Sequence, residues 1–388
     1  MKRNILFISR WYPSRYDPME GLFVQKHAHA VSLYNNVSVL FVYEHTDVKK
    51  FEVCTSKYHD INEIIVYYPA YKNVILNKVF KHLGFLYAYV IGFRKLKKLD
   101  LRVDIVHANV LTRTVLIAFL YKLITNTPYV ITEHWTRLLP GRNGFNGFLR
   151  KLSAKLVVKN AGCIMPVSNE LLCGLKENKL LLTKYMIIEN VVDECFYNEY
   201  PKIKRDKIRL LNVTCFLDSA KNISGLLRVI RKLSEQRKDF ELVLIGEGID
   251  YQNIYEYYKS LQFENDDIVS FVGLKTSEEV AEMMQNADLL VQFSNYESAG
   301  VVVQEALVSG LPVVSTKVGI APDYINESNG VLIEPGDEKE LLIALKKTIE
   351  NNHNFDKEQI RKNVENNFSY ANIGQKFTSI YNNIIEKK

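Results

Sequence analysis

The C-terminal half of the chain alternates short apolar or β-branched runs with longer stretches whose apolar residues recur at helical spacing. The strand candidates are Arg209–Cys215, Glu241–Ile245, Val269–Val272, Leu289–Phe293, Pro312–Ser315 and Val331–Ile333. The helical stretches between them include Gly225–Arg237, Tyr251–Leu261, Ser277–Asn286 and Glu338–Ile349. Such alternation joins parallel strands through right-handed crossovers. It therefore predicts a doubly wound α/β domain.

The N-terminal half repeats this alternation less regularly. Its strand candidates are Ile5–Ser9, Val37–Tyr43, Ile64–Tyr68, Ile105–Ala108, Tyr129–Thr132, Cys163–Val167 and Met186–Ile188. A length of 388 residues also suits two domains. We predict two Rossmann-like domains, at residues 1–197 and 208–369, with a cleft between them that binds ligands beyond the carboxyl ends of the strands.

Two further segments complete the predicted domain organisation. The polar stretch Asn198–Lys207 is the best candidate for the linker. Residues 370–388 carry apolar side chains at helical spacing and are expected to form a closing helix that packs back on the N-terminal domain.

The five cysteines are widely spaced and none forms a C-x-x-C pair, which argues against a disulfide framework and a zinc site. The apolar stretch near the N-terminus, Ile5–Ile8, is too short for the core of a signal peptide. There is no run of eighteen apolar residues that could span a bilayer. We expect a cytoplasmic protein, with any membrane contact peripheral and at the inner face.

The charge is distributed unevenly between the two halves. Residues 1–200 hold 27 basic and 16 acidic residues out of 50 and 44 in the whole chain, so the N-terminal half is basic and the remainder acidic. A basic surface attracts phosphate-rich partners, whether nucleic acid or anionic lipid. The sequence contains no nucleic-acid recognition motif, so we expect no nucleic-acid partner.

The most informative segment runs from Ser294 to Pro312. A strand ends near Ser294, the small-residue turn Ser298–Gly300 follows, and a helix then continues until Gly310 and Pro312 stop it. Such a turn lets a ligand approach the backbone and presents free N–H groups at the positive end of the helix, which suits a phosphate.

Two carboxylates bracket this predicted phosphate site. Glu297 precedes the turn, and Glu305 lies about two turns along the helix. Carboxylates on both sides of a diphosphate suit the hydroxyls of a nucleotide sugar. Taken alone, the spacing also fits an ordinary helix with one exposed and one capping glutamate.

The segment resembles the retaining nucleotide-sugar glycosyltransferases of family 4, which have the GT-B fold of two Rossmann-like domains. The resemblance rests on Glu297-x7-Glu305, on the Gly310-Leu-Pro312 continuation and on Gly330-Val-Leu-Ile-Glu-Pro-Gly-Asp337. It implies that Glu297 contacts the donor sugar and that Glu305 holds the ribose hydroxyls. The amides around Ala299, Gly300 and Val301 would hold the diphosphate. The family commonly has glycine and an aromatic residue where this chain has Ser298 and Ala299.

Weaker features in the second domain fit the same resemblance. Lys221 resembles the phosphate-binding lysine of the family, whose charge would offset the leaving diphosphate. The arginine usual five residues earlier is replaced by Phe216. Gly246 and Gly273 fit the turns of a nucleotide-sugar domain. A solvated lysine and plain structural turns remain alternative interpretations of these residues.

The first domain contributes two candidate residues for the donor site. Gly21 follows the first strand and would let backbone approach the diphosphate, although a plain turn glycine fits as well. His134 lies at the carboxyl end of a strand, where the family places a histidine near the donor sugar. It would hydrogen-bond a sugar hydroxyl or stabilise developing charge.

Basic stretches with interleaved apolar residues occur at Phe93–Lys98 and Arg142–Lys159. The second has helical spacing and could lie on an anionic membrane where a lipid-linked acceptor is held. Solvated helix faces explain both stretches equally well.

These features together predict a retaining hexosyl-type glycosyltransferase that uses a nucleoside-diphosphate sugar, with UDP favoured over GDP. The acceptor is a saccharide or a lipid-linked molecule, in the synthesis of cell-surface polysaccharide or glycan. The only paired acids in a loop are Asp266 and Asp267 and no Asp-x-Asp motif is present, so we expect no metal and no cofactor. A phosphorylase or epimerase on the same scaffold, or a non-catalytic nucleotide-sugar sensor, remains an alternative.

Overall fold

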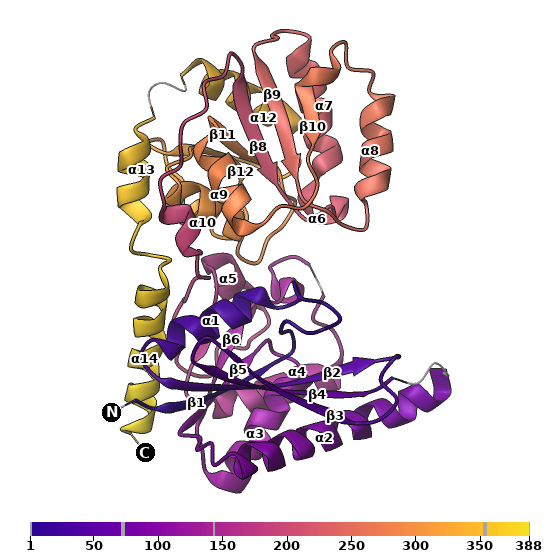
Figure 1. Ribbon diagram of the computed structural model, residues 1–388, viewed down its shortest axis with the longest axis vertical. Coiled ribbons are helices and arrows are strands. Elements are labelled where there is room, and N and C mark those ends of the chain that lie inside the picture. The colour runs from indigo at the N-terminus through magenta and orange to yellow at the C-terminus, as the bar shows by residue number, and fades with distance from the viewer. Residues whose placement is uncertain (1, 71–73, 143, 352–354, 388) are drawn as a thin grey trace. The chain divides into compact units, whose positions relative to one another are not determined.

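The computed structural model describes residues 2–70, 74–142, 144–351 and 355–387 (Figure 1). The chain divides into two compact units. The N-terminal unit holds residues 1–167, 171–191 and 370–388, and the C-terminal unit holds residues 168–170 and 192–369. The division falls before the predicted boundary at residue 197, because Cys195 and Phe196 pack into the core of the C-terminal unit.

The N-terminal unit is built on a seven-stranded sheet in the order β3-β4-β2-β1-β5-β6-β7. Its strands are β1 (Asn4–Ser9), β2 (Asn36–His45), β3 (Glu52–Tyr58), β4 (Ile61–Pro69), β5 (Ile105–Asn109), β6 (Tyr129–Glu133) and β7 (Ile164–Pro166). All pairs are parallel except β3 with β4. The central strands β5 and β6 are buried along their whole length, as parallel strands covered on both faces should be.

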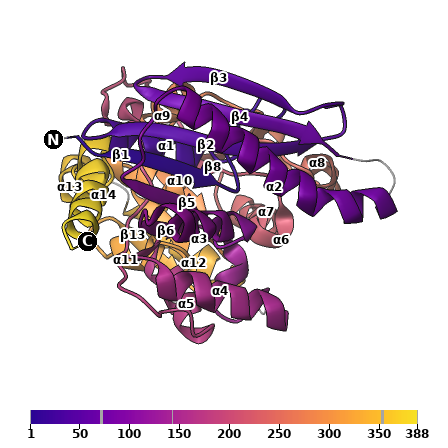
Figure 2. The ribbon, with the colours of Figure 1, turned by 90° about the horizontal axis from the view of Figure 1, so that it is seen from below.

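The helices of this unit connect and cover these strands. They are α1 (Leu22–Ser32), α2 (Val74–Lys98), α3 (Arg113–Thr125), α4 (Phe148–Asn160), α5 (Asn169–Glu177), whose first two residues belong to the C-terminal unit, and α14 (Tyr370–Ile385), with the short 3-10 helix η1 (Thr136–Leu138). Seen from below, α3 and α4 lie side by side (Figure 2). Among the described residues, none of the helices is both long and apolar enough to cross a bilayer.

The closing helix α14 packs on α1 of the N-terminal unit (Figure 1). Its buried residues include Ile373, Phe377 and Tyr381, and a Cβ on Gly374 would lie 2.1 Å from the carbonyl oxygen of Ala30. The two helices can approach this closely only with glycine at that position. The Tyr381 hydroxyl also lies 2.6 Å from Nδ1 of His107 on β5, which fastens the helix to the sheet.

The C-terminal unit contains a six-stranded parallel sheet in the order β10-β9-β8-β11-β12-β13. The strands are β8 (Ile208–Val213), β9 (Phe240–Ile245), β10 (Val269–Phe271), β11 (Leu289–Gln292), β12 (Val313–Thr316) and β13 (Gly330–Ile333). The helices are α6 (Asp218–Lys221), α7 (Ile223–Ser234), α8 (Tyr251–Ser260), α9 (Ser277–Gln285), α10 (Val301–Val308), α11 (Ala321–Tyr324), α12 (Glu338–Glu350) and α13 (Lys357–Val364), with the 3-10 helices η2 (Glu194–Tyr197) and η3 (Asp266–Ile268).

The predicted strand–helix alternation is confirmed in both units, with two differences. Met186–Ile188 is not a strand. The N–H of Met186 donates a hydrogen bond to the carbonyl of Ile164, but this pairing amounts to an isolated bridge between Ile164 and the preceding residue, Tyr185. The edge strand β3 was not predicted, because most of its side chains are exposed and it has no apolar face. The strand at the edge of a sheet needs to bury little of its surface.

Candidate functional site

The turn between β11 and α10 carries the carboxylate that the sequence singles out. The Glu297 carboxylate accepts hydrogen bonds from Lys221 Nζ at 2.5 Å and from Ser294 Oγ at 2.9 Å, and both bonds reach the same oxygen, Oε1. The side chains of Lys221 and Glu297 are only 17% and 18% exposed. Two residues predicted separately, on loops distant in the sequence, are thus brought into one partly buried ion pair.

Backbone contacts hold these two loops together. Asn295, in the turn after β11, donates its N–H to the carbonyl of Ala220 at 2.7 Å, one residue before Lys221. Its side-chain amide reaches the carbonyl of Ser219 at 3.2 Å. Lys221 therefore faces Glu297 because α6 is fastened to the turn and not only because of the charge pair.

Burial disfavours the ammonium form of Lys221, but the charge and hydrogen bond of Glu297 outweigh that effect, so the pKa of Lys221 is raised. The lysine is accordingly a fixed cation throughout the physiological range of pH. A fixed cation that neither gains nor loses a proton can offset the charge of a bound phosphate.

The N-terminus of α10 leaves backbone donors available beside this ion pair. Within the described residues, no hydrogen bond satisfies the amides of Ala299, Gly300 or Val301. Gly300 has φ 82°, a conformation that side chains rarely adopt, and a Cβ there would meet nothing closer than 3.8 Å. The turn therefore offers open space and unpaired donors, as an anion site at a helix N-terminus requires.

The predicted glycines differ in what occupies the space beside them. A Cβ on Gly21 would lie 2.4 Å from the backbone of Trp11, and one on Gly246 would lie 1.8 Å from the carbonyl oxygen of Thr214. A Cβ on Gly273 would meet nothing within 4 Å. Close packing of the protein's own backbone thus accounts for glycine at the first two positions, whereas Gly273 borders open space, as Gly300 does.

Two other sequence-based interpretations are clarified by the fold. Phe216 is fully buried and packs against Tyr251 and Phe271, so the position where the family has an arginine supplies core packing here. Glu305 lies half-buried on α10 in the turn of helix after the free amides. Its place on the helix is the one that the sequence predicted.

Three residues that sequence reasoning missed support the turn. Ser168 donates its hydroxyl hydrogen bond to the carbonyl of Ser298 at 2.6 Å, and Glu170 accepts one from the amide of Gly319. Gly319 has φ 62°, and a Cβ there would lie 2.3 Å from the carbonyl of Ala299. Gly319 follows the carboxyl end of β12, so the rule that ligands bind at these ends could have identified it.

Glu170 adds a second carboxylate to the surroundings of Glu297. Burial raises its pKa, the Gly319 amide lowers it, and repulsion from Glu297 and Asp323 raises it further. Three acidic groups, Glu170, Glu297 and Asp323, and one lysine therefore share this part of the C-terminal unit.

His134 lies in the N-terminal unit, directly after β6. The residue is 6% exposed and its ring packs on that of Phe23 with the centroids 4.4 Å apart. Its Nε2 is buried and has no hydrogen-bond partner among the residues that the structure describes. Burial lowers its pKa well below the ordinary value, and the neighbouring His27 and His107 lower it further. The imidazole is therefore neutral near pH 7 and can donate or accept a hydrogen bond.

Glu133 organises the backbone around this histidine. Its carboxyl group is completely buried and accepts hydrogen bonds from the amides of His134 at 2.8 Å, Trp135 at 2.7 Å and Leu111 at 2.6 Å. Burial raises the pKa of Glu133 to about 7, against the effect of these three donors. Glu133 is thus a positioning residue for the loop that carries His134.

Glu133→Gln is expected to lower the free energy of unfolding by about 1–3 kcal/mol at pH 5, because an amide cannot accept all three bonds and leaves a buried N–H unpaired. The difference in the free energy of unfolding between the wild type and Glu133→Gln should become smaller as the pH rises to 8. The folded-state pKa of about 7 lies above the value of 4.5 for an unperturbed glutamate, so wild-type stability falls as the pH rises through this window. Urea unfolding at pH 5 and pH 8 measures both effects.

The exposed Glu327, changed to glutamine, is the matched control and should leave unfolding unchanged at both pH values. A gap between wild type and Glu133→Gln that widens with pH would contradict the raised pKa. It would mean that the ionised carboxylate is the better acceptor.

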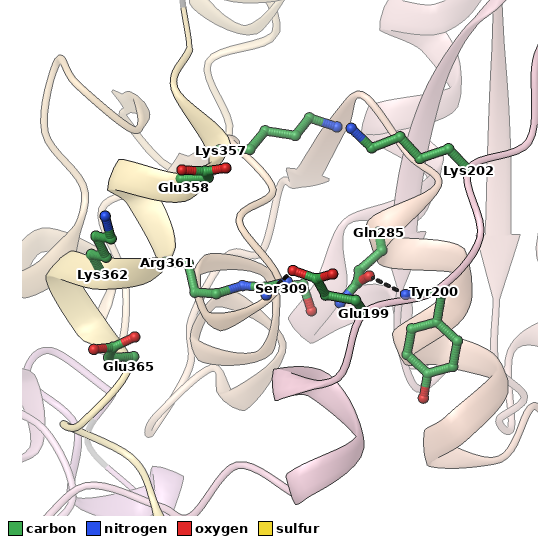
Figure 3. Close-up of a pocket in the computed structure, with 10 residues that line it drawn as sticks. All are labelled: Glu199, Tyr200, Lys202, Gln285, Ser309, Lys357, Glu358, Arg361, Lys362 and Glu365. Carbon is green, nitrogen blue, oxygen red and sulfur yellow. Dashed lines mark hydrogen bonds and ion pairs between the residues drawn. The ribbon is translucent and has the colours of Figure 1, made fainter.

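A separate polar cavity of about 510 Å³ lies in the C-terminal unit (Figure 3). It is lined by Glu199, Tyr200, Lys202, Gln285, Ser309, Lys357, Glu358, Arg361, Lys362 and Glu365. The four cations face three carboxylates, and Lys357 already donates to the carbonyl of Ala287 at 3.0 Å. None of the predicted site residues lines this cavity, so it is distinct from the turn at Glu297.

Comparison with known proteins identifies the C-terminal unit. Residues 199–367 match the family model described as "Glycosyl transferases group 1". This segment of the chain therefore resembles the group 1 glycosyltransferases. The matched segment contains Lys221, the turn at Glu297 and the whole of α10.

Two relatives illustrate the range of this glycosyltransferase family. N-acetyl-alpha-D-glucosaminyl L-malate synthase of Bacillus anthracis is 30% identical over 223 residues, which are 54% of this chain and 55% of that protein. An uncharacterised glycosyltransferase of Methanocaldococcus jannaschii is 28% identical over 82% of this chain and 83% of its own length. The first match thus spans only about half of that relative.

Solved structures agree with the GT-B fold predicted for this chain. Sucrose-phosphate synthase from Thermosynechococcus elongatus matches the whole of both chains with a TM-score of 0.77 at 19% identity. Anabaena HepE in complex with UDP and glucose covers 97% of this chain and 98% of its own, with a TM-score of 0.71 at 17% identity. At these identities the likeness concerns the fold.

Proposed function

We propose that this protein is a retaining glycosyltransferase that transfers a sugar from a nucleoside-diphosphate donor, with UDP favoured over GDP, to a saccharide or lipid-linked acceptor. The observation that carries the proposal is the fixed Lys221–Glu297 ion pair beside the unpaired amides of Ala299–Val301. A cation and converging N–H groups stabilise a departing diphosphate. Solved structures of the same fold that contain UDP support the choice of nucleotide.

In this proposal each residue has one task. Lys221 and the amides offset the charge that develops on the diphosphate as its bond to the sugar breaks. Glu297, oriented by Lys221 and Ser294, binds sugar hydroxyls, and Glu305 binds the ribose hydroxyls. His134, neutral at physiological pH, hydrogen-bonds a sugar hydroxyl, which its lowered pKa favours over a charged role.

The family resemblance supports retention, and the lack of an Asp-x-Asp motif in the sequence supports metal independence. The acceptor oxygen attacks the face that the diphosphate leaves, and a diphosphate oxygen takes the acceptor's proton. Because Lys221 and the helix N-terminus supply positive charge, the diphosphate needs no divalent ion for neutralisation. We further propose that the enzyme works in the cytoplasm at the inner face of the membrane, in the synthesis of cell-surface polysaccharide or glycan.

Glu305→Ala is expected to weaken binding of the nucleoside diphosphate by about 1.5–3 kcal/mol, roughly 10- to 150-fold in Kd, because the ribose hydroxyls lose a charged acceptor. Calorimetry and thermal shift against UDP, GDP and ADP, each with and without EDTA, measure this effect. We expect one nucleotide to bind, with EDTA making no difference.

Glu282→Ala, on the exposed face of α9, is the matched control and should bind like the wild type. Unchanged affinity in Glu305→Ala would remove Glu305 from the site. Binding by none of the nucleotides would overturn the proposed donor. Turnover that needs inorganic phosphate or no acceptor would instead point to a phosphorylase or an epimerase, and binding without turnover to a sensor.

A further inference from the structure

A cavity of about 340 Å³ in the N-terminal unit has a chemistry that the donor site does not explain. It lies where the end of β1, the N-terminus of α3 and one face of α4 meet. Its lining residues are Arg10, Leu111, Thr112, Arg113, Leu116, Trp135, Arg150, Ser153, Ala154 and Val157. The volume is within the range of small-molecule sites.

Three guanidinium groups line this cavity, and no carboxylate does. In the part of the chain that the structure describes, no ion pair joins Arg10, Arg113 or Arg150 to an acidic side chain. Arg113 is held instead by aromatic groups, 3.9 Å above the ring of Phe85 and 3.4 Å from the hydroxyl of Tyr68. Carboxylates lie near two of the three, because Arg10 interacts with Glu20 and the Tyr68 hydroxyl joins Arg113 to Glu44, but neither carboxylate lines this cavity. Three guanidinium groups that no carboxylate pairs within the cavity favour an anion supplied by a ligand.

The rest of the lining is mainly apolar. Leu111 comes from the loop before α3, Leu116 from α3 itself, Ala154 and Val157 from α4, and Trp135 from the loop after β6. A free sugar would find few partners on such a wall. The cavity therefore fits a ligand with an anionic group joined to an apolar body.

The same wall adjoins the predicted acceptor side of the N-terminal unit. Trp135 follows His134 directly, and one oxygen of Glu133 accepts the backbone hydrogen bonds of both. A ligand against Trp135 is thus held by the loop that also carries the histidine assigned to the sugar.

The helices that form the cavity also expose apolar side chains to solvent. On α4, Leu149 is 76% exposed and Leu152 and Leu156 are 53% and 47% exposed; on the neighbouring α3, Ile124 is 84% exposed. Residues three and four apart share a helix face, so the α4 leucines form one strip beside the face that lines the cavity. Lys151, Lys155 and Lys159 flank this strip.

We propose that this cavity binds the phosphate group of an acceptor carried on a long apolar chain, and that the α4 strip is where the chain leaves the protein for an anionic bilayer. The inference rests on the proposed function in one respect, the class of acceptor. Arg10, Arg113 and Arg150 bind the phosphate, and Leu111, Leu116 and Trp135 contact the first carbons of the chain. The exposed leucines and lysines of α4 match the apolar and anionic layers of a membrane surface.

Farnesyl phosphate, a soluble molecule with a phosphate on a single apolar chain, is the probe for calorimetry with the full chain. We expect it to bind at least about tenfold more tightly than inorganic phosphate or farnesol, because only it engages both halves of the cavity. Arg10→Gln and Arg150→Gln should each weaken its binding about tenfold or more. Both arginines are exposed, so folding should not be affected. Arg102→Gln, at another exposed arginine, is the control.

Flotation with vesicles tests the strip. The wild type should bind vesicles of phosphatidylcholine with phosphatidylglycerol, and the double variant Leu149→Gln, Leu152→Gln should lose most of that binding. Ile343→Gln, at an equally exposed apolar residue on α12 of the C-terminal unit, should not. Equal vesicle binding by the double variant would overturn the membrane assignment.

Farnesyl phosphate affinity that is unchanged in both arginine variants would overturn the cavity assignment. Inorganic phosphate binding as tightly as farnesyl phosphate would reduce the site to one for free phosphate. Nucleotide binding to the same samples separates the two proposals. If the nucleotide fails to bind while farnesyl phosphate binds through Arg10 and Arg150, the proposed donor is wrong and the cavity assignment stands.

Discussion

Lys221→Met is expected to lower donor turnover by roughly 10²–10³-fold, the effect usual for removing one fixed group that stabilises a developing anion. The lysine is paired with Glu297, the preceding residue Ala220 accepts the N–H of Asn295, and the raised pKa of Lys221 keeps it charged. Methionine keeps most of the volume and removes the charge. Release of nucleoside diphosphate from the sugar donor measures turnover even before the acceptor is identified.

A second variant separates a direct role of Lys221 from a positioning role. Lys221→Met should also weaken nucleoside-diphosphate binding, whereas Glu297→Gln should lower turnover with little change in that affinity, because Glu297 is assigned to the sugar. If both variants leave nucleotide affinity unchanged, Lys221 serves only to orient Glu297. Lys339→Met, an exposed lysine at the start of α12, is the control, and urea unfolding checks that each variant is folded.

The two sheets could be predicted because buried parallel strands have continuous apolar sequences. The strands β11 and β12 are buried at every residue, so their sequences differ clearly from the helices around them. The same criterion fails at an edge. Strand β3 exposes most of its side chains, and its pairing with β4 depends on backbone hydrogen bonds that leave no pattern in the sequence.

The candidate site could be predicted only one residue at a time. Lys221 and Glu297 were each identified by their position after a strand, but their contact depends on how α6 packs against the turn. Gly21 and Gly246 differ from Lys221 and Glu297, because the fold gives each of these glycines a structural reason that does not involve a ligand. Each was predicted either to border a ligand or to be a plain turn glycine, and in the fold the space beside each is filled by the protein's own backbone.

Residues that act by supporting others were the hardest to predict. Glu170 and Ser168 contact Gly319 and Ser298 only in the folded chain, and a serine or glutamate after a strand carries no signal of that role. Phe216 was considered as a substituted site residue, yet it lies in the core. Burial depth at the end of a strand depends on packing that local sequence does not encode.

His134→Phe is expected to lower turnover by roughly 10²-fold while nucleotide affinity stays within about twofold, because the lost hydrogen bond is to the sugar in the transition state. Phenylalanine keeps a ring to pack on Phe23, so this change should cost less than about 1.5 kcal/mol of stability, whereas alanine would leave a cavity. The assay compares the steady-state turnover of the donor with calorimetry of the free nucleotide.

The pH dependence of turnover in the wild type and in His134→Phe tests the protonation state of His134. The pKa of His134 is lowered well below 6.5, so the imidazole is neutral across the range from pH 6 to 8 and its protonation should not reduce wild-type turnover there. The ratio of wild-type to His134→Phe turnover should therefore stay constant between these pH values. A ratio that changes several-fold around pH 6.5 would show that His134 titrates at its ordinary pKa and acts through its charge, contrary to the neutral hydrogen-bonding role that its burial favours.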